Sequence, residues 1–181
     1  MKPIVTVPST VLSTPAKPVE KFDKKLAEHI RDMKDALKRT VNPKGVGLAA
    51  PQIGISLRIF ITRPTEKSAI RVFINPEITK KSEDVTDGVP ERENKLEGCL
   101  SIPAIWGKVR RVRSLTLHYT DETGKKQTEE FSGFMATIIQ HETDHINGVL
   151  FTQRVLEQKG KLYETTKDEN GKEVMERLDL T

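Results

Sequence analysis

Two histidines and one glutamate near residue 140 have the spacing of a hydrolytic metal site. The stretch "QHETDHINGVLF", residues 140–151, places His141 and His145 four positions apart, with Glu142 directly after the first histidine. Residues i and i+4 of a helix share one face, about 5–6 Å apart, so both imidazoles can reach one ion. Glu142, turned about 100° around the helix axis, is placed to hold a water on that ion.

A catalytic metal needs a third protein ligand, and the residues offer two candidates. Glu164 lies downstream of the histidine pair, where metallopeptidases carry their third ligand, whereas Cys99 lies upstream in "EGCLS". Gly98 permits a tight turn there that can direct the thiolate inward. A metal lowers the pKa of its bound water from 15.7 to about 7, and Glu142 can take a proton from that water and return it to a leaving amine.

The apolar pattern predicts which elements carry these residues. Apolar residues recur every three or four positions from Glu20 to Thr40, which predicts an amphipathic helix; they are Phe22, Leu26, Ile30, Met33 and Leu37. Pro43 and Gly45 end this helix. Short β-type runs follow at 57–62, 71–76, 77–82, 113–120 and 125–131, and the last two flank the turn "DETG".

A second helix is predicted at 133–148, where it carries the His-Glu-x-x-His motif and closes on Asn147-Gly148. The tail at 160–178 is typical of two short strands around Asn170-Gly171, a favoured hairpin turn. The sequence therefore predicts an α+β fold with an N-terminal helix, short antiparallel strands, a central motif-bearing helix and a C-terminal hairpin or tail.

Composition and charge narrow the class of protein. The chain has 181 residues, a net charge of +4 and a single cysteine, so no internal disulfide is possible. No apolar run approaches the ~20 residues of a membrane span, and the N-terminus lacks the apolar stretch of a signal peptide. A cytoplasmic protein with no membrane partner is expected. The basic stretch "GKVRRVR", 107–113, indicates either a solvated strand face or contact with nucleic acid or a ribosomal surface, without any motif for sequence-specific nucleic-acid binding.

Three stretches in order carry a family resemblance: "GVGLAAPQ" (45–52), "EGCLS" (97–101) and "QHETDH" (140–145). They resemble the signature motifs of peptide deformylases, and the resemblance covers about residues 3–155. It implies a deformylase-like catalytic domain at 1–155. Residues 156–181 are then a charged C-terminal extension, for which a β-hairpin packed on the same domain is one expectation.

The resemblance also implies roles for individual residues. The metal ligands would be Cys99, His141 and His145, with water in the fourth position. Glu142 would be the general base and acid. The side-chain amide of Gln52 and the backbone N–H of Leu100 would stabilise the oxygen of the tetrahedral intermediate. The substrate-binding residues would be Val46, Gly47, Phe134, Ile138 and Trp106, with Gly47 allowing close approach of the substrate backbone.

The implied substrate is the N-formyl group on the initiator methionine of newly made polypeptides. A metal-activated hydroxide would attack the formyl carbon and release formate. The resemblance implies one divalent ion, Fe²⁺, for which Zn²⁺, Ni²⁺ or Co²⁺ can substitute; the donors themselves would suit zinc. The C-terminal region departs from the helix that the best-known bacterial members use toward the ribosome, so the stretch at 107–113 is a substitute candidate for ribosome contact.

Two other functions compete with this interpretation. One is a zinc metallopeptidase that cleaves internal peptide bonds and uses Glu164 as its third ligand. The other is a non-catalytic basic protein that binds the ribosome or RNA. Metal content and the effect of replacing Cys99 or Glu142 separate the three hypotheses.

Overall fold

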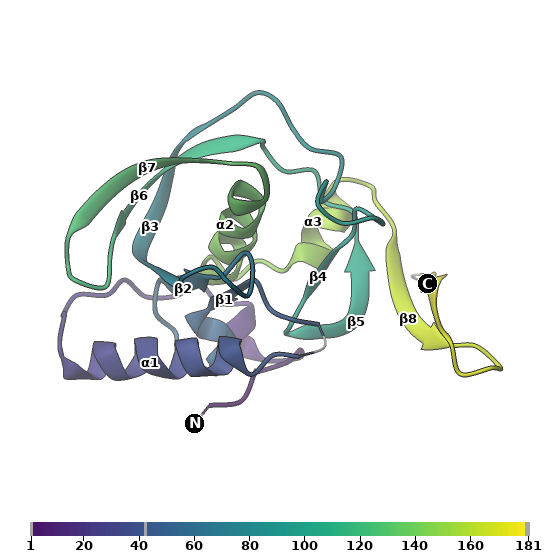
Figure 1. Ribbon diagram of the computed structural model, residues 1–181, viewed down its shortest axis with the longest axis horizontal. Helices are drawn as coiled ribbons and strands as arrows, with labels where there is room; N and C mark the ends of the chain where they lie inside the picture. Colours follow the sequence, from purple (N-terminus) through teal and green to yellow (C-terminus); the bar gives the residue numbers. More distant parts are fainter. Residues whose placement is uncertain (1, 42, 180–181) are drawn as a thin grey trace.

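The computed structural model describes residues 2–41 and 43–179 and shows an α+β fold with three α-helices and two antiparallel sheets (Figure 1). The five-stranded sheet has the order β1 (Gly47–Ala49), β2 (Ile59–Thr62), β3 (Arg71–Lys81), β6 (Ser114–Thr120), β7 (Lys126–Ser132). The four-stranded sheet has the order β4 (Glu97–Cys99), β5 (Ile102–Gly107), β8 (Leu162–Lys167), β9 (Glu173–Arg177). The helices are α1 (Lys24–Lys38), α2 (Gly133–Ile146) and α3 (Phe151–Glu157), with short 3-10 helices η1 (Thr10–Leu12) and η2 (Ala50–Ile53).

The first helix begins later than the apolar spacing predicts. Asp23 caps α1 by accepting a hydrogen bond from the backbone N–H of Leu26 at 2.9 Å, so helical geometry begins at Lys24. Phe22, predicted on the apolar stripe, lies outside the helix with half of its side chain exposed. The remaining stripe residues are buried, as predicted: Leu26, Ile30, Met33 and Leu37.

The longest strand, β3, runs unbroken where the sequence predicts two strands. Asn75 adopts a positive φ of 49°, and its side-chain amide exchanges two hydrogen bonds with the backbone of Val19. The pairing with β6 shifts register between Ile74 and Glu77. A bulge of this kind bends a strand without ending it. The sequence correctly predicted the β6–β7 hairpin and the C-terminal β8–β9 hairpin around Asn170-Gly171.

The helices cover the sheets so that three core clusters form. Along β2, Ile59 and Ile61 face the cluster under α1, whereas Phe60 faces the cluster under α2. This alternation is the period-2 pattern of a strand buried on both faces. The short helix α3, which the sequence pattern missed, packs on β4 and β5 and forms the third cluster. No helix in the described part of the chain is long and apolar enough to cross a membrane.

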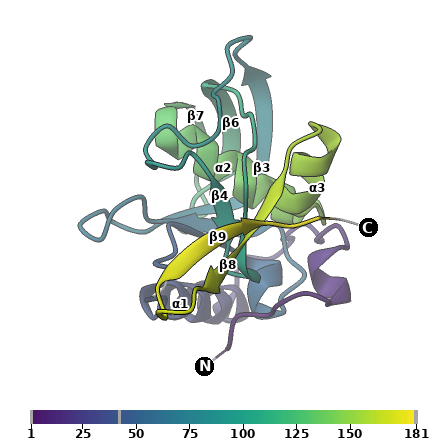
Figure 2. The same cartoon turned by 90° about the vertical axis from the view of Figure 1, so that its right-hand side faces the viewer.

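The site-bearing segments meet where the two sheets adjoin. Helix α2 packs against β1, β2, β6 and β7 of the five-stranded sheet. In Figures 1 and 2, β4 lies beside α2, and the β8–β9 hairpin continues the sheet of β4 and β5 away from the body of the molecule. Strand β4 was not predicted because a strand of three residues shows no measurable alternation. Strand β5 was not predicted because it contains Pro103 and its buried and exposed positions do not alternate.

Candidate metal centre and active site

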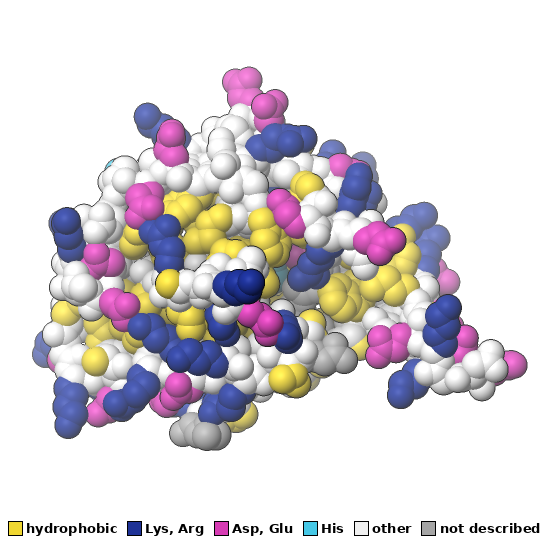
Figure 3. Space-filling model, viewed as in Figure 1, with side chains coloured by type: hydrophobic (Ala, Val, Ile, Leu, Met, Phe, Trp, Pro, Cys, Tyr) yellow, Lys and Arg dark blue, Asp and Glu magenta, His cyan; other side chains and the backbone are white. Residues whose placement is uncertain are grey.

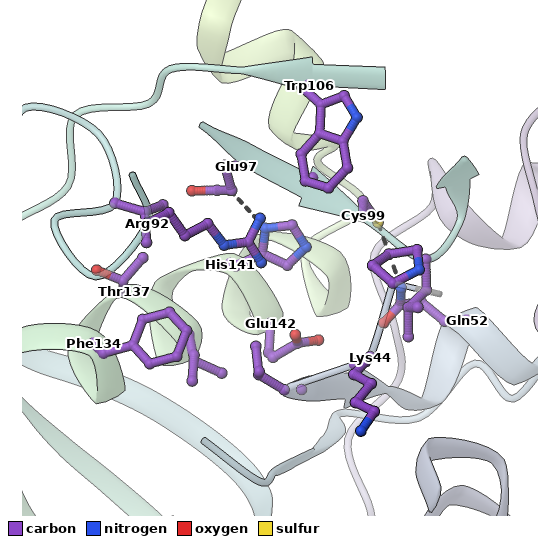
Figure 4. Close-up of a pocket in the computed structure, with 18 residues that line it drawn as sticks. Lys44, Gln52, Arg92, Glu97, Cys99, Trp106, Phe134, Thr137, His141 and Glu142 are labelled. Carbon is purple, nitrogen blue, oxygen red and sulfur yellow. Dashed lines mark hydrogen bonds and ion pairs between the residues drawn. The ribbon is translucent and has the colours of Figure 1, made fainter. Parts of the chain in front are cut away.

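Three potential metal ligands converge from two distant parts of the chain. Helix α2 carries His141 and His145, whose ring centroids lie 4.9 Å apart, and β4 ends at Cys99. The Cys99 Sγ lies 3.1 Å from His145 Nε2, and one donor atom of each residue lies within 4.8 Å of the others. Figure 4 shows two of the three residues, Cys99 and His141. One sulfur and two imidazole nitrogens fit a divalent transition metal, and three protein ligands leave a coordination place open. Glu164 lies on β8, outside this group.

Glu97 fixes the orientation of one ligand. Burial alone would raise the pKa of Glu97, but the guanidinium of Arg111 and the ring of His141 outweigh it and hold that pKa well below its usual range. The ionised carboxylate can only accept, so His141 Nδ1 donates to Glu97 Oε1, at 2.6 Å. The Nε2 atom of His141 is thereby left for the metal, as in the carboxylate–histidine–metal arrangements of other metalloproteins.

Arg111 ties this carboxylate into a buried network. Its Nε and Nη2 donate to the two oxygens of Glu97, at 2.9 and 2.7 Å, and its Nη1 donates to Asp144 at 3.0 Å. Asp144 in turn accepts from Arg154 of α3 at 2.7 Å. The side chain of Arg111 is only 5% exposed. Both sequence interpretations of the stretch 107–113, a solvated face or an RNA contact, are therefore wrong for Arg111.

We expect Arg111→Met to lower the free energy of unfolding by about 3–5 kcal/mol, because it leaves Glu97 and Asp144 buried without their shared cation. Metal affinity should also fall, by about 10–100-fold, since His141 loses its fixed partner. Denaturant unfolding of the metal-free protein measures the first effect, and metal competition the second.

A matched control is Arg110→Met, the neighbouring residue, whose side chain is exposed. It should change the free energy of unfolding by no more than about 0.5 kcal/mol. Equal, small losses for the two variants would contradict a structural role for the Arg111 network.

Glu142 faces the ligands from the same helix. Its residue is 3% exposed, and burial raises its pKa to about 7. Its Oε2 atom has no hydrogen-bond partner among the described residues. A Cβ on Gly47 would lie 2.3 Å from Oε1 of Glu142. A side chain at position 47 would therefore crowd this carboxylate. The resemblance predicts a second reason for the glycine, the close approach of the substrate backbone.

Gln52 presents its amide N–H groups to the same site. Its Oε1 accepts from the backbone N–H of Ala49 at 2.9 Å, which fixes the amide orientation. Its Nε2 then points to Cys99 Sγ at 3.5 Å and to Ser101 Oγ at 3.2 Å. Leu100 follows Cys99 directly and lines the same pocket.

Two of the three potential ligands, Cys99 and His141, border a pocket with a largely apolar wall. The predicted residues Val46, Phe134 and Ile138 line it, together with Gly47, Leu100 and Trp106. Figure 4 shows Phe134 and Thr137 on one side of Glu142 and Trp106 at the opposite end, beyond His141. Trp106 lies against Gly98, where a Cβ would be 2.6 Å from the ring. An apolar slot therefore opens beside a metal-binding group, a carboxylate and an oriented amide.

Known proteins are similar to the chain over most of its length. The profile of the polypeptide deformylase family matches residues 1–161. A peptide deformylase of Agrobacterium fabrum is 41% identical over 158 residues, which is 86% of this chain and 87% of that protein. The chain belongs to the peptide deformylase family.

Solved deformylase structures share the fold. That of Thermotoga maritima superposes with a TM-score of 0.75 at 36% identity, covering 85% of this chain and 97% of its own. The structure of a peptide deformylase from Synechococcus elongatus, in complex with actinonin, superposes with a TM-score of 0.73 at 36% identity. The match covers 83% of this chain and 76% of that chain.

Membership in the peptide deformylase family establishes the class of reaction. The chain is a hydrolase that removes the formyl group from the N-terminal methionine of newly made polypeptides, and deformylases depend on a metal. Neither the metallopeptidase nor the non-catalytic alternative is supported. The predicted α+β fold is confirmed, whereas its description by a central helix carrying the His-Glu-x-x-His motif is not, because the group that the structure assembles is Cys99, His141 and His145.

Sequence reasoning missed several residues of the deformylase site. Glu97 and Arg111 were not singled out, nor were two pocket residues, Arg92 and Thr137. Glu97 could have been found from strand periodicity, since residues two apart on a strand point to the same face and Cys99 is two positions on. Arg111 offered no such signal, because its neighbours Lys108, Arg110 and Arg113 are exposed.

Proposed function

We propose that Cys99, His141 and His145 hold a single divalent metal ion in this deformylase, with one coordination place open. The close approach of the three donors supports this ligand set. When bound, the ion supplies Lewis-acid chemistry: it polarises the formyl carbonyl and lowers the pKa of a water. Glu97 keeps the His141 ring turned toward the ion.

Glu142 is the residue that moves the proton. Its carboxylate is buried beside the ligands, with one oxygen free of partners among the described residues. It takes a proton from the attacking water and delivers it to the amine as the formamide C–N bond breaks. The products are formate and a free N-terminal amine. A proton transfer of this kind contributes about 10²–10⁴ in rate.

Gln52 and Leu100 stabilise the oxygen on which negative charge develops. The Gln52 amide is oriented before substrate arrives, by its bond to the backbone of Ala49. The backbone N–H of Leu100, next to Cys99, is the second donor. Each such donor lowers the barrier by about 2.7–4 kcal/mol.

The methionine side chain occupies the apolar slot, with Val46, Phe134 and Ile138 as its walls. Gly47 and Trp106 complete the substrate-binding set, Gly47 beside Glu142 and Trp106 at the rim. A formyl carbon carries only hydrogen besides its oxygen and nitrogen, so a crowded site accepts it and rejects larger acyl groups.

We further propose Fe²⁺ as the resident ion, with Zn²⁺, Ni²⁺ or Co²⁺ as substitutes, and the cytoplasm as the location. Residues 1–155 are proposed as the catalytic domain and 156–181 as an extension, of which 180–181 lie outside the described residues. The exposed Lys108, Arg110 and Arg113 are proposed to contact the ribosome surface, because clustered cations complement an RNA backbone.

An assay of anaerobically purified protein tests substrate and metal together. We expect about one metal ion per chain by elemental analysis and release of formate from a formyl-methionyl peptide. Chelation should abolish turnover, and added Fe²⁺, Ni²⁺, Co²⁺ or Zn²⁺ should restore it to different extents. Actinonin, the ligand in the Synechococcus elongatus structure, should inhibit the loaded enzyme. Turnover that survives complete metal removal would contradict the proposed function.

A further inference from the structure

The β8–β9 hairpin lies beyond the part of the chain that matches the family profile, which ends at residue 161. It is nevertheless part of the sheet that carries the candidate metal ligand. Strand β8 pairs with β5 in the register Trp106↔Tyr163, and β5 pairs with β4, which ends at Cys99. Figures 1 and 2 show the hairpin as the outer continuation of this sheet.

One side-chain contact joins the hairpin to the active-site pocket. The indole Nε1 of Trp106 donates to Oγ1 of Thr165 on β8, at 2.8 Å. The other edge of the ring lies on Gly98 of β4, where no side chain fits beneath it. The hairpin therefore holds the indole against the strand that presents Cys99.

The face that lines the pocket continues across the hairpin. Partners in register point to the same face, as do residues two apart on a strand, so Trp106, Tyr163 and Thr165 share one face. On β9, Met175 pairs with Thr165 on this face and is 41% exposed. Figure 3 shows hydrophobic side chains gathered on this side of the molecule as well as over the central hollow.

A second hollow adjoins the pocket at Trp106. It is lined by Pro43, Arg92, Glu93, Asn94 and Trp106, three of which also line the pocket beside the candidate metal ligands. The guanidinium of Arg92 lies 5.6 Å from the centroid of the indole, and among the described residues it pairs with no carboxylate; its Nη1 donates to the Leu96 carbonyl at 3.2 Å. The hollow thus offers a flat apolar wall and a cation with unused donors.

We propose that the β8–β9 hairpin is a substrate-specificity element, in which Thr165 positions Trp106 as the wall for the residues that follow formyl-methionine. This inference rests on the proposed function. With methionine in the apolar slot, the rest of the peptide must leave through the adjoining hollow. An extended chain advances about 3.3–3.6 Å per residue, which brings the second to fourth residues past Trp106 and Arg92. Peptide carbonyls can accept from Arg92, and side chains can lie on the indole.

The test compares Thr165→Val with Thr166→Val, the same substitution one position along β8. The Thr166 hydroxyl has no hydrogen-bond partner among the described residues. Kinetics are measured with formyl-Met-Ala and with formyl-Met-Ala-Ala-Ala. Thr165→Val should raise KM for the four-residue substrate about three- to tenfold more than KM for the two-residue substrate, with similar kcat effects on both. Thr166→Val should keep the wild-type ratio of the two KM values, that of the four-residue substrate to that of the two-residue substrate.

A second variant removes the donor of the Trp106–Thr165 hydrogen bond instead of its acceptor. Trp106→Phe lacks the N–H donor and should raise the same ratio of KM values. In the double variant, Trp106→Phe should change this ratio little beyond the effect of Thr165→Val alone. Trp106 is the only tryptophan, so its fluorescence reports binding directly. With the Glu142→Gln enzyme, the four-residue substrate should change its emission more than the two-residue substrate does.

Equal changes of KM for both substrates, or the same result for Thr165→Val and Thr166→Val, would overturn the role of the hairpin and leave deformylation intact. Failure of the wild-type enzyme to release formate from either peptide would instead overturn the proposed function, and this inference with it.

Discussion

Replacement of Glu142 by glutamine is expected to lower kcat for a formyl-methionyl peptide by at least about a hundredfold, while the protein keeps its metal. Glutamine has nearly the shape of glutamate but cannot accept a proton at its amide nitrogen or exchange one near neutral pH. The packing of this side chain between Gly47 and the ligand pair is preserved. Formate release and elemental analysis of the same sample separate proton transfer from metal binding.

The matched control is Glu130→Gln, an exposed residue on β7, which should keep wild-type kcat and metal content. A variant at Glu142 that retains more than about a tenth of the wild-type kcat would contradict its role as general base. Loss of the metal along with the activity would show that Glu142 serves to retain the ion instead.

Replacement of Cys99 by alanine is expected to remove the metal and to lower deformylation by at least about a thousandfold. The thiolate is the one ligand that does not come from α2, and the two imidazoles alone leave the ion with too few protein donors. Since the ion contributes several kcal/mol to the transition state, its loss dominates the rate. Elemental analysis after dialysis and formate release at saturating peptide measure both effects.

His118→Ala serves as the control, because His118 is exposed on β6 and outside the ligand group. It should retain full metal content and activity. Stoichiometric metal in the Cys99→Ala protein would contradict the ligand assignment.

The strongly periodic or turn-punctuated elements could be predicted from the sequence. Three predictions were confirmed: the apolar stripe of α1, the β6–β7 hairpin around "DETG" and the β8–β9 hairpin at Asn170-Gly171. Each rests on apolar periodicity or on turn residues within a single segment, so it does not depend on distant parts of the chain. The predicted start of α1 was wrong because Asp23 caps the helix, so that Phe22 lies outside it although Phe22 fits the apolar spacing. Strand β4 and helix α3 are too short to show a period, and β5 contains Pro103 and does not alternate. These three elements form through their burial against one another.

The sequence by itself determined the histidine pair and its glutamate, because a helix places residues four apart on one face whatever surrounds it. Together with two further motifs it also pointed to the deformylase family. Only the tertiary structure decided that Cys99 lies beside His145, 46 positions away in the chain, that Arg111 points inward to Glu97, and that Thr165 holds Trp106. These contacts depend on how β4, α2 and β8 pack, and long-range packing leaves no periodic trace in any one segment.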